Sequence, residues 1–195
     1  AVSNGLYRAT TDYAEVAKAD AISICVPTPL RKTRDPDISY IQSALMQMRE
    51  HIKKPCLIVL ESTTYPGTTE EIVAGMLEEV GLEIDKDVFV AFSPERVDPG
   101  NATYHLRNTP KVIGGVTEDS TELAVTLYGK FVDNVHAVGS AAEAEMVKLL
   151  ENTFRAVNIA LVNEMMLMCD RMGINIWRVI EAAGTKPFGF MKFTP

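Results

Sequence analysis

Three short apolar runs, each followed by a polar loop that contains proline, constrain most strongly what this chain can fold into. The runs cover residues 21–26, 56–60 and 88–92. Nearly continuous apolar runs of this length, separated by helical stretches, are typical of strands in a parallel sheet that is covered on both faces. Ligands of such sheets bind beyond the carboxyl ends of the strands. We therefore expect the hydroxyls and the carboxylate of the three loops to gather at one edge of the sheet.

The segments around these runs alternate between helix and strand. Helices are predicted at about residues 12–19, 39–52, 68–80 and 118–131, and further short strands at 7–10, 111–114 and 135–138. Thr11 and Thr117 are the expected N-caps, and Gly81 ends the third helix. The alternation predicts an α/β fold with right-handed crossovers.

The pattern changes at residues 141–172, which contain no proline or glycine and consist almost entirely of helix formers. A helix of ~32 residues is ~48 Å long, so it outruns the sheet domain. Gly173 ends it, and a shorter helix is predicted at 176–183. We expect one domain at 1–139 and a second packing unit at 140–195, which begins with the long helix.

Composition and charge exclude several classes of function. The formal net charge of −7 and the isoelectric point near 5.0 argue against a surface for nucleic acid or anionic membranes. Local cations such as Arg96, Lys148 and Arg155 can still hold a phosphate or a carboxylate. The three histidines are scattered without metal-ligand spacing, so no metal site is predicted.

The three cysteines are an odd number, and two of them fall inside predicted strands. This pattern indicates reduced packing thiols rather than a disulfide framework. No run approaches the ~18 apolar residues of a membrane span, and the chain does not open with a signal segment. We therefore expect a cytoplasmic protein.

Lys148 and Asn152 project from one face of the predicted long helix, because they are four residues apart. Their neighbours are apolar, and buried polar groups need polar partners. The alternative is that Lys148 extends to solvent and Asn152 is merely exposed.

The loops after the strands offer a carboxylate and several hydroxyls. Glu95 either points into the ligand crevice, where it can orient or deprotonate water, or forms a surface pair with Arg96. Thr28, Ser62 and Thr63 either donate to a phosphate, ribose or reacting oxygen, or cap the helices that follow.

Five signatures occur in one order along the chain. They are Val-Pro-Thr-Pro at 26–29, Glu-Ser-Thr at 61–63 with Pro-Gly-Thr-Thr at 66–69, Ser-Pro-Glu-Arg-Val-Asp-Pro-Gly at 93–100, Lys-x-x-x-Asn-Thr-Phe at 148–154, and Pro-Phe-Gly-Phe at 187–190. In this order they make the chain resemble the UDP-sugar 6-dehydrogenases, which act on UDP-glucose, UDP-N-acetylglucosamine or UDP-N-acetylmannosamine. The form at 93–100 resembles the branch for N-acetylated sugars more than the UDP-glucose branch.

The resemblance implies an NAD-dependent, two-step oxidation of the sugar C6 alcohol to a carboxylate, for the synthesis of surface polysaccharide precursors. A cysteine nucleophile holds the substrate as a thiohemiacetal and then as a thioester. By motif, Thr63 lies near the nicotinamide and the reacting oxygen, and Glu95 supports thioester hydrolysis. Lys148 and Asn152 stabilise negative charge on the oxygen at C6.

The resemblance also implies binding residues and a partner. Residues on the cofactor side are Val26, Pro27, Thr28, Ser62 and Thr63. Residues on the sugar-nucleotide side are Glu95, Arg96, Val97, Lys148, Asn152, Arg155, Phe188, Gly189 and Phe190. On this view residues 1–139 are the C-terminal part of a Rossmann-like NAD-binding domain. Residues 140–195 hold the central helix and part of a helical domain through which two copies form a homodimer.

Two features of the family are missing from the 195 residues. No Gly-x-Gly-x-x-Gly opens the chain, and Cys25, Cys56 and Cys169 do not match the Gly-Gly-His-Cys loop of the nucleophile. Asp98-Pro99 also stands where UDP-glucose enzymes often have a second acidic residue. We therefore expect this chain to be a fragment that is inactive alone, cut from an active enzyme.

Two other interpretations remain open at this point. β-Hydroxyacid dehydrogenases of the 6-phosphogluconate or hydroxyisobutyrate type also place Lys-x-x-x-Asn on a long helix after a Rossmann domain, and use no cysteine. A non-catalytic dimerisation module would explain the long apolar helix, because such a helix needs a partner surface.

Overall fold

The computed structural model describes residues 5–33, 35–98 and 100–195. The described chain divides into two compact units, with the boundary between Lys148 and Leu149. Pro99, part of the predicted signature at 93–100, lies outside the described residues.

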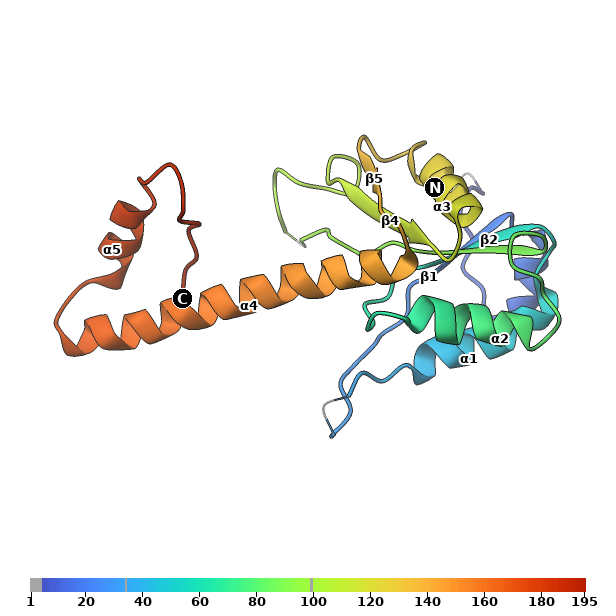
Figure 1. Ribbon diagram of the computed structural model, residues 1–195, viewed down its shortest axis with the longest axis horizontal. Helices are drawn as coiled ribbons and strands as arrows, with labels where there is room; N and C mark the ends of the chain where they lie inside the picture. The colour runs from blue at the N-terminus through green and yellow to red at the C-terminus, as the bar shows by residue number, and fades with distance from the viewer. Residues whose placement is uncertain (1–4, 34, 99) are drawn as a thin grey trace. The chain divides into compact units, whose positions relative to one another are not determined.

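A five-stranded sheet forms the centre of the first unit (Figure 1). Its strands are β1 (Ala21–Ile24), β2 (Cys56–Leu60), β3 (Val88–Phe92), β4 (Lys111–Gly115) and β5 (Val135–Ala137), and they lie in this order. β1, β2 and β3 run parallel. Ile24 pairs with Leu60, and Leu60 pairs with Phe92, so the three strands end level with one another. The loops that follow them therefore start at one edge of the sheet.

The prediction of a parallel sheet in an α/β fold is confirmed for β1, β2 and β3, but the antiparallel β4 makes the whole sheet mixed. β4 runs antiparallel to β3, with Phe92 opposite Gly114, and β5 runs parallel to β4. A parallel neighbour requires a crossover, usually a helix, that carries the chain back. In the described part of the 93–110 connection no helix is formed, so the chain returns directly and β4 enters the sheet in the opposite direction.

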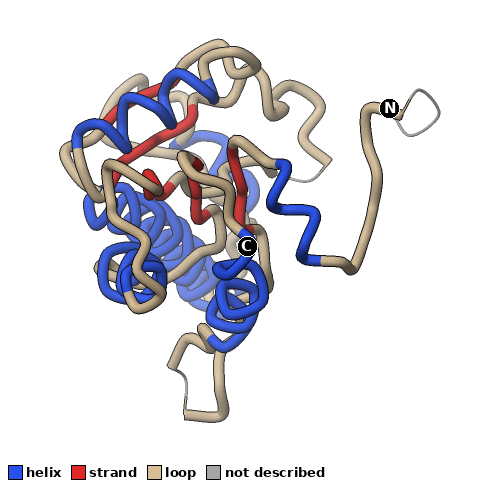
Figure 2. The backbone as a smooth tube through the Cα atoms, turned by 90° about the vertical axis from the view of Figure 1, so that its right-hand side faces the viewer, coloured by secondary structure: helices blue, strands red, loops and turns tan. Residues whose placement is uncertain are grey.

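Helices cover both faces of the sheet (Figures 1 and 2). They are the 3₁₀ helices η2 (Tyr13–Lys18) and η3 (Arg49–His51), the π-helix η4 (Thr68–Ala74), and the α-helices α1 (Ser39–Met48), α2 (Gly75–Glu78) and α3 (Glu118–Tyr128). β2 is buried at every position because alternate side chains serve opposite faces. Ile58 packs in the cluster of α1 and α2, and Val59 packs in the cluster of α3.

Several element boundaries differ from the sequence predictions. Residues 7–10 form no strand, and Asp12 rather than Thr11 caps the first helix, because its Oδ1 accepts from the Ala14 N–H. The first central strand ends at Ile24 rather than at residue 26, because the Val26 N–H leaves the sheet and donates to Ser62 Oγ. The strands at 56–60 and 88–92 and the Thr117 cap are confirmed.

The long helix is confirmed as α4 (Ala141–Arg171). Its first turns pack on the core of the first unit through Ala141 and Ala144. In the second unit, α5 (Ile176–Ala183) packs Ile176 and Ile180 against Cys169. None of the described helices is both long and apolar enough to cross a membrane.

Candidate active site

A cavity of about 370 Å³ lies beyond the carboxyl ends of β1, β2 and β3. Its lining residues come from the three loops that follow these strands: Cys25, Val26, Pro27, Thr28, Glu61, Ser62, Thr63 and Glu95. The structure thus brings every predicted cofactor-side residue together with Glu95. The parallel, level ends of the three strands are the reason.

Ser62 fixes the shape of this cavity from within. Its side chain is buried, and its Oγ accepts from the Val26 N–H at 2.8 Å and lies 2.8 Å from the Val26 carbonyl oxygen, to which it donates. The hydroxyl therefore joins the loop after β2 to the loop after β1. It neither caps the following helix nor points freely at a ligand.

Lys148 contacts the cavity loop after β3. Its Nζ donates to the backbone carbonyl of Glu95 at 2.5 Å. The interpretation in which Lys148 only extends to solvent is therefore wrong. An ammonium group is held at the loop that supplies one wall of the cavity.

The Glu95 carboxylate is exposed and accepts from the backbone of its own loop. Its Oε1 accepts from the Arg96 N–H at 2.7 Å and from the Val97 N–H at 2.5 Å. The Arg96 guanidinium donates to the Pro110 carbonyl at 2.6 Å. These contacts tie the Glu95 side chain to the backbone of its own loop, and Glu95 lines the cavity.

The remaining predicted site residues lie in the second unit. Asn152 Oδ1 accepts from Arg155 Nη2 at 3.4 Å on α4. Phe188 and Phe190 are exposed, and Gly189 adopts a left-handed conformation with φ +70°, which turns the chain between them. The structure describes these residues within that unit alone.

Glu61 is a cavity residue that sequence reasoning quoted in a motif but did not assign to the site. Its carboxylate forms a salt bridge with Lys111 Nζ and accepts from Tyr128 OH at 2.6 Å and from Ser23 Oγ at 2.7 Å. Burial alone would raise the pKa of Glu61, but the hydrogen bonds from Lys111, Tyr128 and Ser23 outweigh it and hold this pKa below its ordinary value. The wall of the cavity therefore carries a neutralised ion pair rather than a free negative charge.

Glu145 is a second residue that sequence reasoning missed. It lies one turn before Lys148 on α4, and its carboxylate is completely buried. All of its hydrogen-bond donors come from residues 64–69, in the segment that follows Thr63: Thr64 Oγ1, the Gly67 N–H, the Thr69 N–H and Thr69 Oγ1. A charged residue among apolar neighbours at the start of a helix was the available signal.

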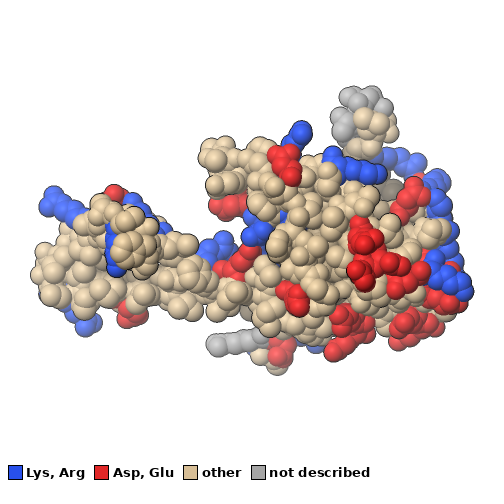
Figure 3. Space-filling model, turned by 45° about the horizontal axis from the view of Figure 1, so that its top comes forward, with Lys and Arg blue, Asp and Glu red and all other residues tan. Residues whose placement is uncertain are grey.

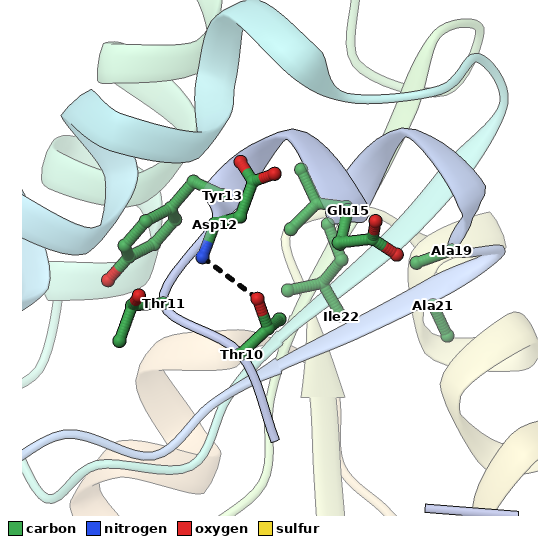
Figure 4. Close-up of a pocket in the computed structure, with 9 residues that line it drawn as sticks. Thr10, Thr11, Asp12, Tyr13, Glu15, Ala19, Ala21 and Ile22 are labelled. Carbon is green, nitrogen blue, oxygen red and sulfur yellow. Dashed lines mark hydrogen bonds between the residues drawn. The ribbon is translucent and has the colours of Figure 1, made fainter. Parts of the chain in front are cut away.

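The first unit also has a second pocket and a surface on which charged side chains gather. A second pocket lies beside β1 at the edge of the sheet, where the Asp12 N–H donates to Thr10 Oγ1 (Figure 4), and none of the predicted site residues lines it. On the face drawn in Figure 3, acidic side chains gather over the first unit with Lys and Arg at its rim.

Among residues 5–33, 35–98 and 100–195, no group of three or more His, Cys, Asp or Glu side chains is placed to hold a metal ion.

Comparisons with protein families match nearly the whole chain. Residues 1–132 match the NAD binding domain of the UDP-glucose/GDP-mannose dehydrogenase family, and residues 142–195 match the central domain of the same family. The resemblance inferred from the signatures is therefore confirmed.

Individual proteins give the same result. The chain is 41% identical over 194 residues to an NDP-N-acetyl-D-galactosaminuronic acid dehydrogenase from Ralstonia solanacearum, covering 96% of this chain and 45% of the relative. A structure of a UDP-D-ManNAc dehydrogenase from Pyrococcus horikoshii matches with a TM-score of 0.93 and 39% identity, covering 100% of this chain and 46% of that one. A 3-hydroxyisobutyrate dehydrogenase from Mycobacterium tuberculosis, at 13% identity, TM-score 0.69 and coverage of 91% of this chain and 55% of that one, shows likeness of fold alone. The chain thus spans about 45% of the length of the curated relatives it matches.

Proposed function

We propose, because this chain belongs to the UDP-glucose/GDP-mannose dehydrogenase family, that it is part of an NAD-dependent UDP-N-acetylhexosamine 6-dehydrogenase. The observation that carries the proposal is the cavity beyond β1, β2 and β3, which lies in the part of the chain that matches the NAD binding domain. Relatives named for N-acetylated sugars support the choice of substrate. The sequence form at 93–100 points in the same direction.

The cavity suits one end of a dinucleotide. Val26 and Pro27 offer an apolar wall for a flat ring, and Thr28 and Thr63 offer hydroxyls for ribose or amide groups. Ser62 sets the spacing of the two loops through its bonds to Val26. The salt bridge from Lys111 reduces the repulsion that Glu61 would otherwise exert on a phosphate. NAD, when bound, accepts the hydrides of the reaction.

The chemistry that we assign to the chain's own residues is the handling of charge and water at C6. Lys148 donates to the oxygen at C6 and stabilises its negative charge, with Asn152 as a second donor. Glu95 orients the water that hydrolyses the thioester, and Thr63 helps to order the reacting groups. Arg96, Val97, Arg155 and residues 188–190 bind the sugar nucleotide. The nucleophilic cysteine is none of the three in this sequence.

We also propose which domain each part of the chain forms. Residues 1–139 form the C-terminal part of the NAD-binding domain, and residues 140–195 form the central helix and part of a dimerisation domain. Exposed apolar side chains on α4, among them Val157, Leu161 and Met168, support a homodimer. Sedimentation of the full-length protein tests the dimer. We place the enzyme in the cytoplasm, in the supply of polysaccharide precursors.

The alternative functions have less support. A β-hydroxyacid dehydrogenase shares the fold but not the substantial sequence identity that the nucleotide-sugar enzymes show. A dimerisation module alone would not require the cavity and its polar groups. The exposed face of α4 is compatible with an enzyme that dimerises.

Incubation of the full-length protein with NAD and a UDP-sugar tests the proposal. We expect one NADH for each of the two oxidation steps, with UDP-N-acetylglucosamine or UDP-N-acetylmannosamine preferred to UDP-glucose. The 195-residue chain alone should form no NADH. A full-length protein that forms no NADH with any UDP-sugar, but oxidises a β-hydroxyacid, would show that the assignment is wrong.

A further inference from the structure

The hydrogen bonds of Glu145 connect α4 to the loop that carries Thr63. Glu145 Oε2 accepts from the Gly67 N–H at 2.7 Å, and Oε1 accepts from the Thr69 N–H at 2.9 Å and from Thr69 Oγ1 at 2.7 Å. Thr64 Oγ1, adjacent to Thr63, lies 3.4 Å from the same oxygen. A single side chain therefore engages both ends of the segment between Thr64 and Thr69.

This contact is energetically demanding, so its presence needs an explanation. The side chain is fully buried, and burial raises the pKa of Glu145 against the opposing effect of its hydrogen bonds from Thr69 and Gly67. A buried apolar residue at this position would avoid the cost of removing a carboxylate from water. No cation pairs with it among the contacts found in the described residues; its donors are backbone N–H groups and hydroxyls.

The position of Glu145 on α4 explains why a buried carboxylate is present there. Glu145 and Lys148 are three residues apart on α4, so they lie on neighbouring positions of one helix face. Lys148 donates to the Glu95 carbonyl in the loop after β3, while Glu145 accepts from the loop after β2. The first turns of α4 therefore fix two of the three cavity loops relative to each other.

We propose that Glu145 is a positioning residue, which holds the Thr63 loop in register with Lys148 for the oxidation at C6. The proposal rests on the proposed function and extends it to a residue that does not touch the cavity. Removing the carboxylate leaves Thr63 in place in the sequence but lets its hydroxyl move relative to the Lys148 ammonium. Small displacements of this kind reduce the rate of the chemical step more than they reduce binding.

The test compares Glu145→Gln with Glu143→Gln in the full-length protein. Both changes remove one carboxylate from the first turns of α4, but Glu143 is exposed and accepts from Gly139 rather than from the Thr63 loop. The new NH2 group of Glu145→Gln must face either the Gly67 N–H or the Thr69 N–H, because each carboxylate oxygen accepts from one of these backbone donors. We expect kcat to fall roughly 10- to 100-fold in Glu145→Gln with little change in KM, and to stay near the wild-type value in Glu143→Gln.

A double-mutant cycle separates positioning from general destabilisation. If Glu145 acts through Thr63, adding Glu145→Gln to Thr63→Ala should reduce kcat by less than about threefold further. Losses of kcat that multiply in the double variant would overturn the proposal. If Glu145→Gln fails to fold, Thr69→Ala, which removes one of the donors, takes its place in the same cycle.

Hydrogen exchange gives a readout that does not depend on activity. Peptides covering residues 61–69 should exchange faster in Glu145→Gln than in Glu143→Gln, while peptides of β2 and β3 keep their protection. Unchanged exchange at 61–69 would contradict the positioning role. A wild-type protein without NADH formation would instead reject the proposed function, whatever the exchange shows.

Discussion

Lys148 contacts the cavity loop through a hydrogen bond from its Nζ to the backbone carbonyl of Glu95. Ala144 and Val147, which precede it on α4, pack on the core and anchor this turn of the helix. A preorganised cation of this kind requires no reorganisation when negative charge develops on a substrate oxygen. The proposed role of Lys148 therefore leads to a direct kinetic expectation.

Replacing Lys148 by Met removes the charge and keeps most of the side-chain volume. We expect kcat of the full-length enzyme to fall roughly 10²- to 10³-fold, the cost of removing one donor from an oxyanion site, with a smaller change in KM for NAD. Lys86→Met is the matched control, because Lys86 pairs with Glu83 on the surface. Equal kcat values in the two variants would remove Lys148 from the mechanism.

The salt bridge between Glu61 and Lys111 should make the stability of the fold depend on pH. The pKa of Glu61 lies below its ordinary value of 4.5 in the folded state, so the pair stabilises the fold above pH 4.5. This stabilisation is lost as the pH falls from 4.5 through the lower folded-state pKa. Breaking the buried pair with Glu61→Gln should cost roughly 3 kcal/mol at pH 7.

Urea unfolding measured at pH 7 and near pH 3 checks this expectation. The difference in unfolding free energy between wild type and Glu61→Gln should shrink at the lower pH. Glu83→Gln, which removes an exposed partner of Lys86, should change stability little at either pH. A Glu61→Gln difference that stays constant across this range would contradict the account.

At the scale of elements, the junction between β4 and α4 tolerates no added side chain at Gly114. A Cβ atom there would lie 2.0 Å from the Ser140 carbonyl oxygen, which is backbone and cannot rotate away. Gly114→Ala should therefore destabilise the protein by roughly 1–3 kcal/mol or more, which is the usual cost of overpacking. Thermal unfolding measures the loss.

Gly75→Ala is the control for that prediction. Gly75 begins α2 with φ −56°, and no atom lies within 4 Å of its would-be Cβ. The change should stabilise the protein by about 0.4–1 kcal/mol, because alanine has fewer conformations to lose on folding. Similar melting temperatures for the two variants would show that the packing at Gly114 is looser than described.

The elements that sequence reasoning predicted best are those with a continuous local signal. β2 and β3 are apolar throughout, and α4 has no Gly or Pro over its length, so each was predicted near its observed bounds. The direction of β4 could not be predicted, because the direction of a strand depends on its connection rather than on its own residues. Residues 7–10 show that a short apolar-polar stretch without a partner strand carries little information.

The residues of the candidate site also differ in whether the sequence alone could predict them. Thr28, Thr63 and Glu95 could be predicted because they follow strands, and parallel strands bring their carboxyl ends to one edge. The partners of Glu145 are 76 to 81 residues away in sequence, and Lys111 is 50 residues from Glu61. Contacts over such separations are created by the fold and leave no spacing pattern.

In the molecule as a whole, the sheet unit carries a polar cavity and the long helix carries exposed apolar side chains. The sheet unit supplies the cofactor-side residues, and the first turns of α4 hold two of its loops in register. The second unit supplies Asn152, Arg155 and residues 188–190 to the proposal. The central claim is that the cavity at the ends of β1, β2 and β3 is where oxidation takes place.

An experimental structure of the full-length protein with bound NAD tests that claim most directly. We expect the nicotinamide ring between Val26 and Thr63, with the Lys148 ammonium on the side from which the sugar approaches. A nicotinamide bound beside the pocket of Thr10 and Tyr13, or anywhere away from the Thr63 and Glu95 loops, would contradict it.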